Sequence, residues 1–141
     1  TTWLYPFFLS PAGRRPQHAM QLEFLDFDYS EDEEGTATWD AVASVPAYRL
    51  PQLEQEILAL LAWAHEEFGP LRGPVETGGL WDYDLQCERD GLPLLALSYA
   101  PKTGHLVPRP QPLQHEHVTL TLSLSGGPAF AEAFAARFGP I

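Results

Sequence analysis

Cysteine, basic residues and long apolar runs are scarce in this sequence, and each scarcity excludes a class of protein. A single cysteine, Cys87, cannot form an internal disulfide. Eight basic residues stand against 19 acidic ones, which gives a formal net charge of −11. Such a surface repels nucleic acid and anionic lipid, so we expect neither as a partner. No apolar run approaches the roughly 18–20 residues needed to cross a bilayer, so we expect no membrane span.

The sequence near the start and the scarcity of cysteine predict the cellular compartment of the protein. The apolar residues near the start have no basic region ahead of them, and no cysteine framework indicates an oxidising compartment. We therefore expect a cytoplasmic protein. Many Ala, Pro and Arg residues beside the single Lys102 are typical of a GC-rich, bacterial genome.

The first 19 residues differ in composition from the rest of the chain. Residues 1–9 are mostly aromatic or aliphatic, and Pro and Arg follow them. We interpret residues 1–19 as an arm that lies over the core or a neighbouring subunit, or that docks on a partner, because so many apolar side chains are costly to leave in water. Residues 20–141 then form one α+β domain. Met20, the single methionine, is a candidate alternative start of translation.

A helix predicted over Leu50–Phe68 is the clearest element. Pro51 suits its first turn, and Gly69-Pro70 ends it. Apolar residues recur at steps of three and four and form one stripe, which needs another layer to cover it. The stripe consists of Leu50, Leu53, Ile57, Leu60, Leu61, Ala64 and Phe68.

Alternation of apolar and polar residues predicts strands before and after this helix. The return strand after Asp90-Gly91 is almost continuously apolar, which favours a central position, and the Pro-rich stretch 101–112 is predicted to be irregular. The predicted strands are Gln21–Tyr29, Thr36–Val45, Leu80–Arg89, Leu92–Tyr99 and Val118–Leu124.

A second helix follows the last strand. We expect Ser125 to cap it and Pro128 to lie in its first turn, with phenylalanines at steps of four on its buried edge. The resulting order, ββα-βββα, predicts an α+β two-layer sandwich. Its sheet is mainly antiparallel, has about five strands, and carries both helices on one face.

Acidic residues gather on the polar sides of these predicted strands. If both helices cover one face, the other face collects carboxylates among threonines and serines, and it could attract a basic protein. The alternative is an ordinary solvated sheet face. The candidate partner-binding residues are Asp26, Asp28, Asp40, Asp82 and Asp84.

Two histidines suggest a different site. In an extended segment His115 and His117 point the same way, about 6.5–7 Å apart, which suits two imidazoles on one zinc ion. His105, or an acid on a neighbouring strand, could supply a third ligand. The alternative is exposed histidines at the entry of a strand.

No catalytic constellation is evident. Cys87 falls on an apolar strand face, where a free cysteine behaves as a small hydrophobe. Four aromatic residues could line a small-molecule pocket between sheet and helices, or could simply be core: Trp39, Trp63, Trp81 and Tyr83.

The sequence predicts a fold class and a charge but does not identify a function. Our leading hypothesis is a small acidic, non-enzymatic module that binds a basic protein or a second copy of itself, in the manner of an immunity protein, an antitoxin or an adaptor. The alternative is a divalent-metal protein or metalloenzyme that uses His105, His115 and His117, with zinc as the cofactor.

Overall fold

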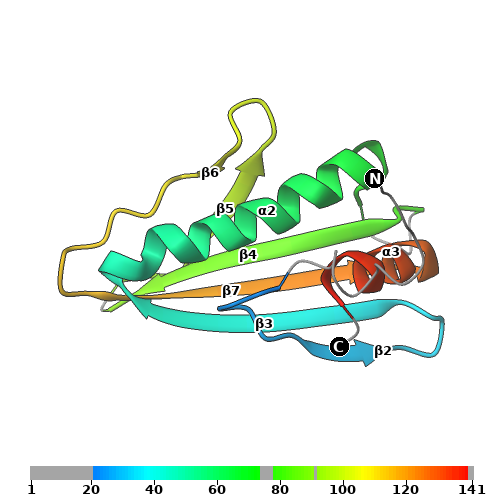
Figure 1. Ribbon diagram of the computed structural model, residues 1–141, viewed down its shortest axis with the longest axis horizontal. Helices are drawn as coiled ribbons and strands as arrows, with labels where there is room; N and C mark the ends of the chain where they lie inside the picture. Colours follow the sequence, from blue (N-terminus) through cyan, green and yellow to red (C-terminus); the bar gives the residue numbers. More distant parts are fainter. Residues whose placement is uncertain (1–20, 74–77, 91, 140–141) are drawn as a thin grey trace, which may run out of the picture.

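The computed structural model describes residues 21–73, 78–90 and 92–139, so the predicted arm of residues 1–19 lies outside the described residues. The described chain has an α+β fold, in which a six-stranded open antiparallel sheet carries two α-helices in the order ββαββββα (Figure 1). The strands are β2 (Asp28–Glu31), β3 (Ala37–Pro46), β4 (Trp81–Arg89), β5 (Leu95–Ala100), β6 (His105–Val107) and β7 (His117–Gly126), and the helices are α2 (Leu50–Phe68) and α3 (Pro128–Phe138).

The strand order across the sheet is β2-β3-β7-β4-β5-β6, and every neighbouring pair is antiparallel. The last strand in the sequence, β7, therefore lies between β3 and β4. These two strands run parallel to each other on either side of it, and α2 connects them as the crossover of a split β-α-β unit.

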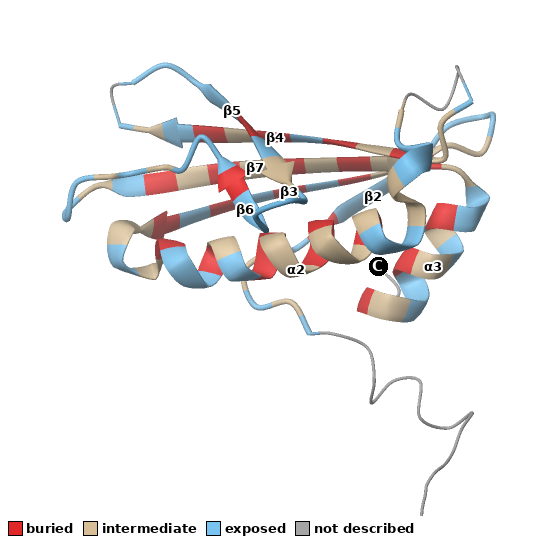
Figure 2. Cartoon of the chain, turned by 90° about the horizontal axis from the view of Figure 1, so that it is seen from above, coloured by how far each residue is buried: buried red, intermediate tan, exposed pale blue. Residues whose placement is uncertain are grey.

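Both helices lie on the same face of the sheet (Figure 2), which confirms the predicted two-layer arrangement. Burial follows the pleat: alternate residues of β3, β4 and β7 are buried, and the residues between them are exposed or half-buried. Trp81 and Tyr83 face the helices, and Asp82 and Asp84 face the other way. The sheet thus has a helix-covered face and an open face, as its alternation predicted.

Aromatic side chains fill the space between the two layers. The rings of Trp81 and Phe130 stack at 5.7 Å with an interplanar angle of 9°. Trp39 lies 4.8 Å from Phe134, and Trp63 contacts Phe130 at 5.7 Å, measured between ring centroids. Of the tryptophans that the sequence offered as a possible pocket lining, Trp39 and Trp81 are buried in the core, and Trp63 is half-buried against it.

The start of α3 differs from the prediction. Ser125 does not cap the helix, because β7 continues to Gly126 and the N-cap residue is Gly127, without a side-chain cap bond. Gly126 permits a close approach instead: a Cβ added there would lie 2.5 Å from Cδ2 of Phe130. Gly126 thus lets the helix pack closely against the end of the central strand.

The predicted first strand, Gln21–Tyr29, is mostly wrong. Strand β2 begins only at Asp28. The backbone N–H groups of residues 23–25 instead donate hydrogen bonds to the side chain of Glu56 on α2, so they are not available to a sheet ladder.

The predicted central position of Leu92–Tyr99 is also wrong. Strand β5 begins at Leu95, is second from one edge, and pairs with β4 only over Leu85–Cys87. Its apolar run leaves the side chain of Leu94 64% exposed. Strand β6 lies inside the stretch predicted to be irregular, and with β5 it forms a hairpin that contacts α2.

Candidate functional site: the open face of the sheet

The strand register aligns the acidic residues in a row across the open face. Asp28 pairs with Asp40, Asp40 pairs with Ser123, and Ser123 pairs with Asp84. Three carboxylates and one hydroxyl therefore cross four adjacent strands, a span of about 14 Å at the usual strand spacing. We call Asp28, Asp40 and Asp84 the acidic row.

Hydroxyl groups flank the acidic row. The neighbouring row consists of Ser30, Thr38, Ser125 and Asp82. On the other side Val42 pairs with Thr121, and further along Ser44 accepts a hydrogen bond from Thr119 at 3.0 Å. The open face thus combines carboxylates with small groups that can donate or accept hydrogen bonds.

The carboxylates differ in their partners. Asp82 is neutralised by Arg72, whose Nε lies 2.7 Å from Asp82 Oδ1. Asp40 accepts a hydrogen bond from the hydroxyl of Ser123, and Asp84 accepts one from Gln86 Nε2 at 3.2 Å. Within residues 21–73, 78–90 and 92–139, no Lys, Arg or His lies within ion-pair distance of the acidic row.

Asp26, the fifth predicted residue, is exposed but precedes β2 and has no place in the strand register. The structure therefore brings Asp28, Asp40, Asp82 and Asp84 onto one face and leaves Asp26 beside it.

A shallow hollow of about 160 Å³ lies at one end of the acidic row. It is smaller than the roughly 300–1,000 Å³ of typical small-molecule sites, so it fits the end of a side chain better than a whole cofactor. Its lining consists of Asp82, Tyr83, Asp84, Ser123, Leu124 and Ser125.

The three candidate zinc ligands are not all brought together. His105 begins β6 at the sheet edge, His117 begins the central β7, and β4 and β5 separate these strands. His115 is exposed just before β7. Among the described residues, no group of three or more His, Cys, Asp or Glu side chains is placed to hold a metal ion.

Glu116, between the two histidines, has a structural partner of its own. The backbone N–H of Leu113 and then Arg89, 2.7 Å away, hold the pKa of Glu116 below its ordinary value. This carboxylate fixes the loop before β7 to the end of β4.

Cys87 lies on the helix-covered face of β4, and burial raises the pKa of its thiol. Its environment therefore disfavours the thiolate that nucleophilic chemistry needs.

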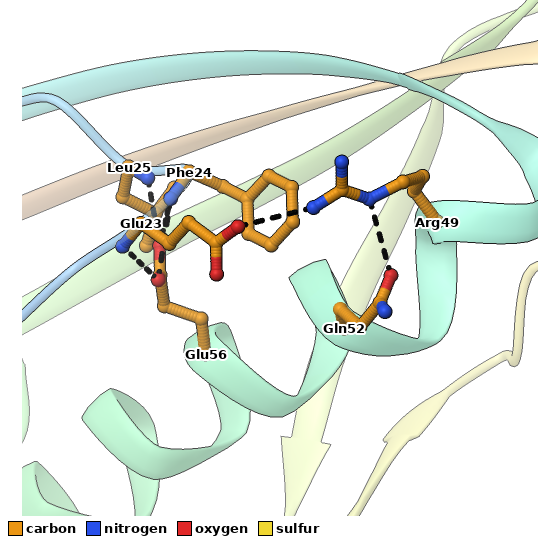
Figure 3. Close-up of polar contacts among 6 residues, drawn as sticks. All are labelled: Glu23, Phe24, Leu25, Arg49, Gln52 and Glu56. Carbon is orange, nitrogen blue, oxygen red and sulfur yellow. Dashed lines mark hydrogen bonds and ion pairs between the residues drawn. The ribbon is translucent and has the colours of Figure 1, made fainter.

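Sequence reasoning missed Glu56, whose exposure is only 7%. Its carboxylate accepts hydrogen bonds from the backbone N–H groups of Glu23, Phe24 and Leu25 (Figure 3). Arg49 supports the same segment, because its guanidinium lies 3.0 Å from the carboxylate of Glu23 and 5.0 Å from the centroid of the Phe24 ring. The position of Glu56 in the helix could have indicated its burial. It lies three residues after Leu53 and four before Leu60, on the apolar stripe.

Neither a protein-family model, nor a curated protein, nor a solved structure matches this chain. Within the described residues, no helix has the length and apolar character that a membrane span requires.

Proposed function

We propose that this protein is a small non-enzymatic binding module whose open acidic sheet face engages a basic protein. The observation that supports the proposal is the acidic row, three carboxylates that lie on one face and have no ion-pair partner among the described residues. Carboxylates in this state attract a cationic surface and speed its arrival. Neutralisation of a basic toxin, as by an immunity protein or antitoxin, is one concrete form, and an adaptor is another.

Charge argues against self-association through this face. A two-fold interface sets the same patch of both copies face to face, so the acidic row would meet a second acidic face and no unpaired cation among the described residues. Like charges set against each other across an interface cost several kcal/mol. A homodimer of this protein would therefore use another surface, and the open face would remain available to a basic partner.

We propose, as part of the same hypothesis, that the protein acts in the cytoplasm of a bacterium. Its basis is the absence of a disulfide framework, together with the composition of the chain. A basic partner would meet a formal charge of −11 there, and salt would screen the attraction.

Two charge-matched double variants test the face. Asp40→Asn with Asp84→Asn removes two charges from the acidic row, and Glu66→Gln with Glu67→Gln removes two from exposed positions near the end of α2. Each variant is used to capture proteins from a bacterial lysate, and affinity for the isolated partner is then measured at low and high salt.

We expect the open-face variant to bind about tenfold more weakly or worse, which is 1.4 kcal/mol, and the helix variant to bind like the wild type. Salt should weaken wild-type binding. Equal effects of the two variants, or an affinity that salt does not change, would contradict the proposal.

A further inference from the structure

Strands β4 and β5 separate soon after they pair, and a group of side chains fills the opening. Their ladder covers only Leu85–Cys87. Beyond it, the hydroxyl of Tyr83 accepts a hydrogen bond from the backbone N–H of Tyr99 at 2.8 Å. On the same side of β4, the backbone of Arg72 bridges to Trp81.

His65 of α2 projects into this opening. Its ring centroid lies 5.4 Å from that of Trp81, 5.0 Å from that of Tyr99 and 6.5 Å from that of Tyr83. Its Nε2 atom is buried and has no hydrogen-bond partner among the described residues. A buried polar nitrogen without a partner is uncommon and calls for an explanation.

The charged groups around His65 are unfavourable to an imidazolium. The nearby cation is Arg72, whose guanidinium lies 4.3 Å from the centroid of the Tyr83 ring and is paired with Asp82. From β4 and β5 the neighbours are the aromatic rings of Trp81, Tyr83 and Tyr99. The next acids on α2, Glu66 and Glu67, are exposed to solvent.

We propose that His65 makes the β5–β6 hairpin sensitive to acid: protonation of its imidazole loosens the packing of Tyr99 and the hairpin on α2, while β3, β4 and β7 remain folded. A charge on Nε2 would be buried against aromatic rings without an acceptor, which is costly. The hairpin is the part that responds because it joins the main sheet through three residue pairs, whereas the β4–β7 ladder has nine.

The direction of the pH dependence follows from the titration of His65. Burial, and then Arg72, lower the pKa of His65 from its ordinary value of 6.5. The open state therefore binds more protons than the closed state. Closure is fully stabilised above about pH 6.5, and this stabilisation is lost as the pH falls through the closed-state pKa, by at most about tenfold in the opening equilibrium per pH unit.

The titration of Glu54 has the opposite effect on the pH dependence of stability. Burial raises the pKa of Glu54, and Arg109 and His105 lower it to a lesser extent. Glu54 therefore favours the folded state on acidification, so the test compares variants with the wild type at each pH.

The experiment is amide hydrogen exchange of the full chain between about pH 5 and 7.5, the range in which histidine titrates, expressed as protection factors. The reporter in the hairpin is Tyr99, whose backbone N–H donates to the hydroxyl of Tyr83, and the reporters in the main sheet are Ala41 and Leu122. His65→Gln removes the titrating group. His105→Gln is the matched control, because it removes an exposed histidine from the same hairpin.

We expect hairpin protection in the wild type and in His105→Gln to fall severalfold, up to about tenfold per pH unit, below pH 6.5, while main-sheet protection stays constant. His65→Gln should show little pH dependence. Hairpin protection that tracks the main sheet at every pH, or that keeps its pH dependence in His65→Gln, would overturn the proposal.

If His65→Gln does not fold, the His65 ring signal in the wild type decides instead. We expect NMR titration to give a pKa below 6.5, and a pKa at or above that value would overturn the proposal.

Discussion

The two faces of the sheet are built from the same strands, yet they have opposite chemical character. On the helix-covered face Trp81, Leu85 and Leu122 are essentially inaccessible. On the open face Val42 is 63% exposed, and the acidic row has no ion-pair partner among the described residues. One strand thus provides core packing with alternate residues and a polar surface with the residues between them, so the surface charge can be changed without removing core packing.

Charge is also divided between the faces. Arg49 and Arg89 pair with Glu23 and Glu116 away from the open face, and Arg72 neutralises Asp82 at one end of it. The row of Asp28, Asp40 and Asp84 is left to interact with solvent or a partner. Three experiments test this contrast, in order of decreasing expected effect.

The largest effect should come from neighbouring residues of β7 on opposite faces. Leu122→Ala removes a fully buried side chain and should cost about 2–5 kcal/mol of unfolding free energy. Thr121→Ala, one residue away on the open face, should cost no more than about 1 kcal/mol. Urea unfolding measures both, and similar losses would show that the two faces contribute alike.

A smaller loss is expected from Glu56→Gln. The amide keeps the size of the carboxylate but turns an NH₂ group toward backbone donors, so we expect a loss of about 1–3 kcal/mol. Amide exchange should increase at Phe24 and Leu25, which donate to this side chain.

Glu66→Gln on the exposed side of α2 is the control, and it should change the unfolding free energy by less than about 0.5 kcal/mol. Unchanged exchange at residues 23–25 in Glu56→Gln would show that Glu56 does not hold this segment.

The smallest effect on stability should come from Asp84→Asn. This side chain is exposed and has no ion-pair partner among the described residues, so we expect a change within about 0.5 kcal/mol, toward higher stability because repulsion within the acidic row decreases. Thermal unfolding at low salt measures it. A loss of stability comparable to that of Leu122→Ala would show that the open face contributes to stability as much as the helix-covered face does.

The sequence predicted an element correctly where several local signals indicated the same segment. Helix α2 has the predicted bounds, Leu50–Phe68, because its apolar stripe, its early proline and the Gly-Pro stop all indicate the same segment. Strands β3, β4 and β7 matched to within a few residues, because each alternates over its length between a covered and an open face.

The errors arose where tertiary contacts decide the outcome. An apolar run such as Leu92–Tyr99 fits a central strand as well as a partly exposed one, and only its pairing distinguishes them. Strand β6 has three residues, too few to show a period. The segment before β2 is held by hydrogen bonds to Glu56 on α2, and no local sequence pattern predicts a contact between residues so far apart in the chain.

The candidate site was predictable in part. Alternation placed Asp40, Asp82 and Asp84 on the polar side of their strands. Their alignment with Asp28 and Ser123 depends on the register between strands that are far apart in the sequence, which a single chain does not reveal. His65 could not be found by spacing, because its environment comes from three other segments.

The central place of β7 determines when this domain can fold during synthesis. The ribosome delivers this strand after all the others, and until then the β2–β3 hairpin and the β4–β5–β6 meander share no neighbour. Joining them brings Pro46 beside His117, 71 positions later in the chain (117 − 46), and closing so long a loop is a slow and entropically costly step. A chain that stops before residue 117 therefore lacks the strand that joins the two pieces, and β3 and β4 each lose their longest pairing partner.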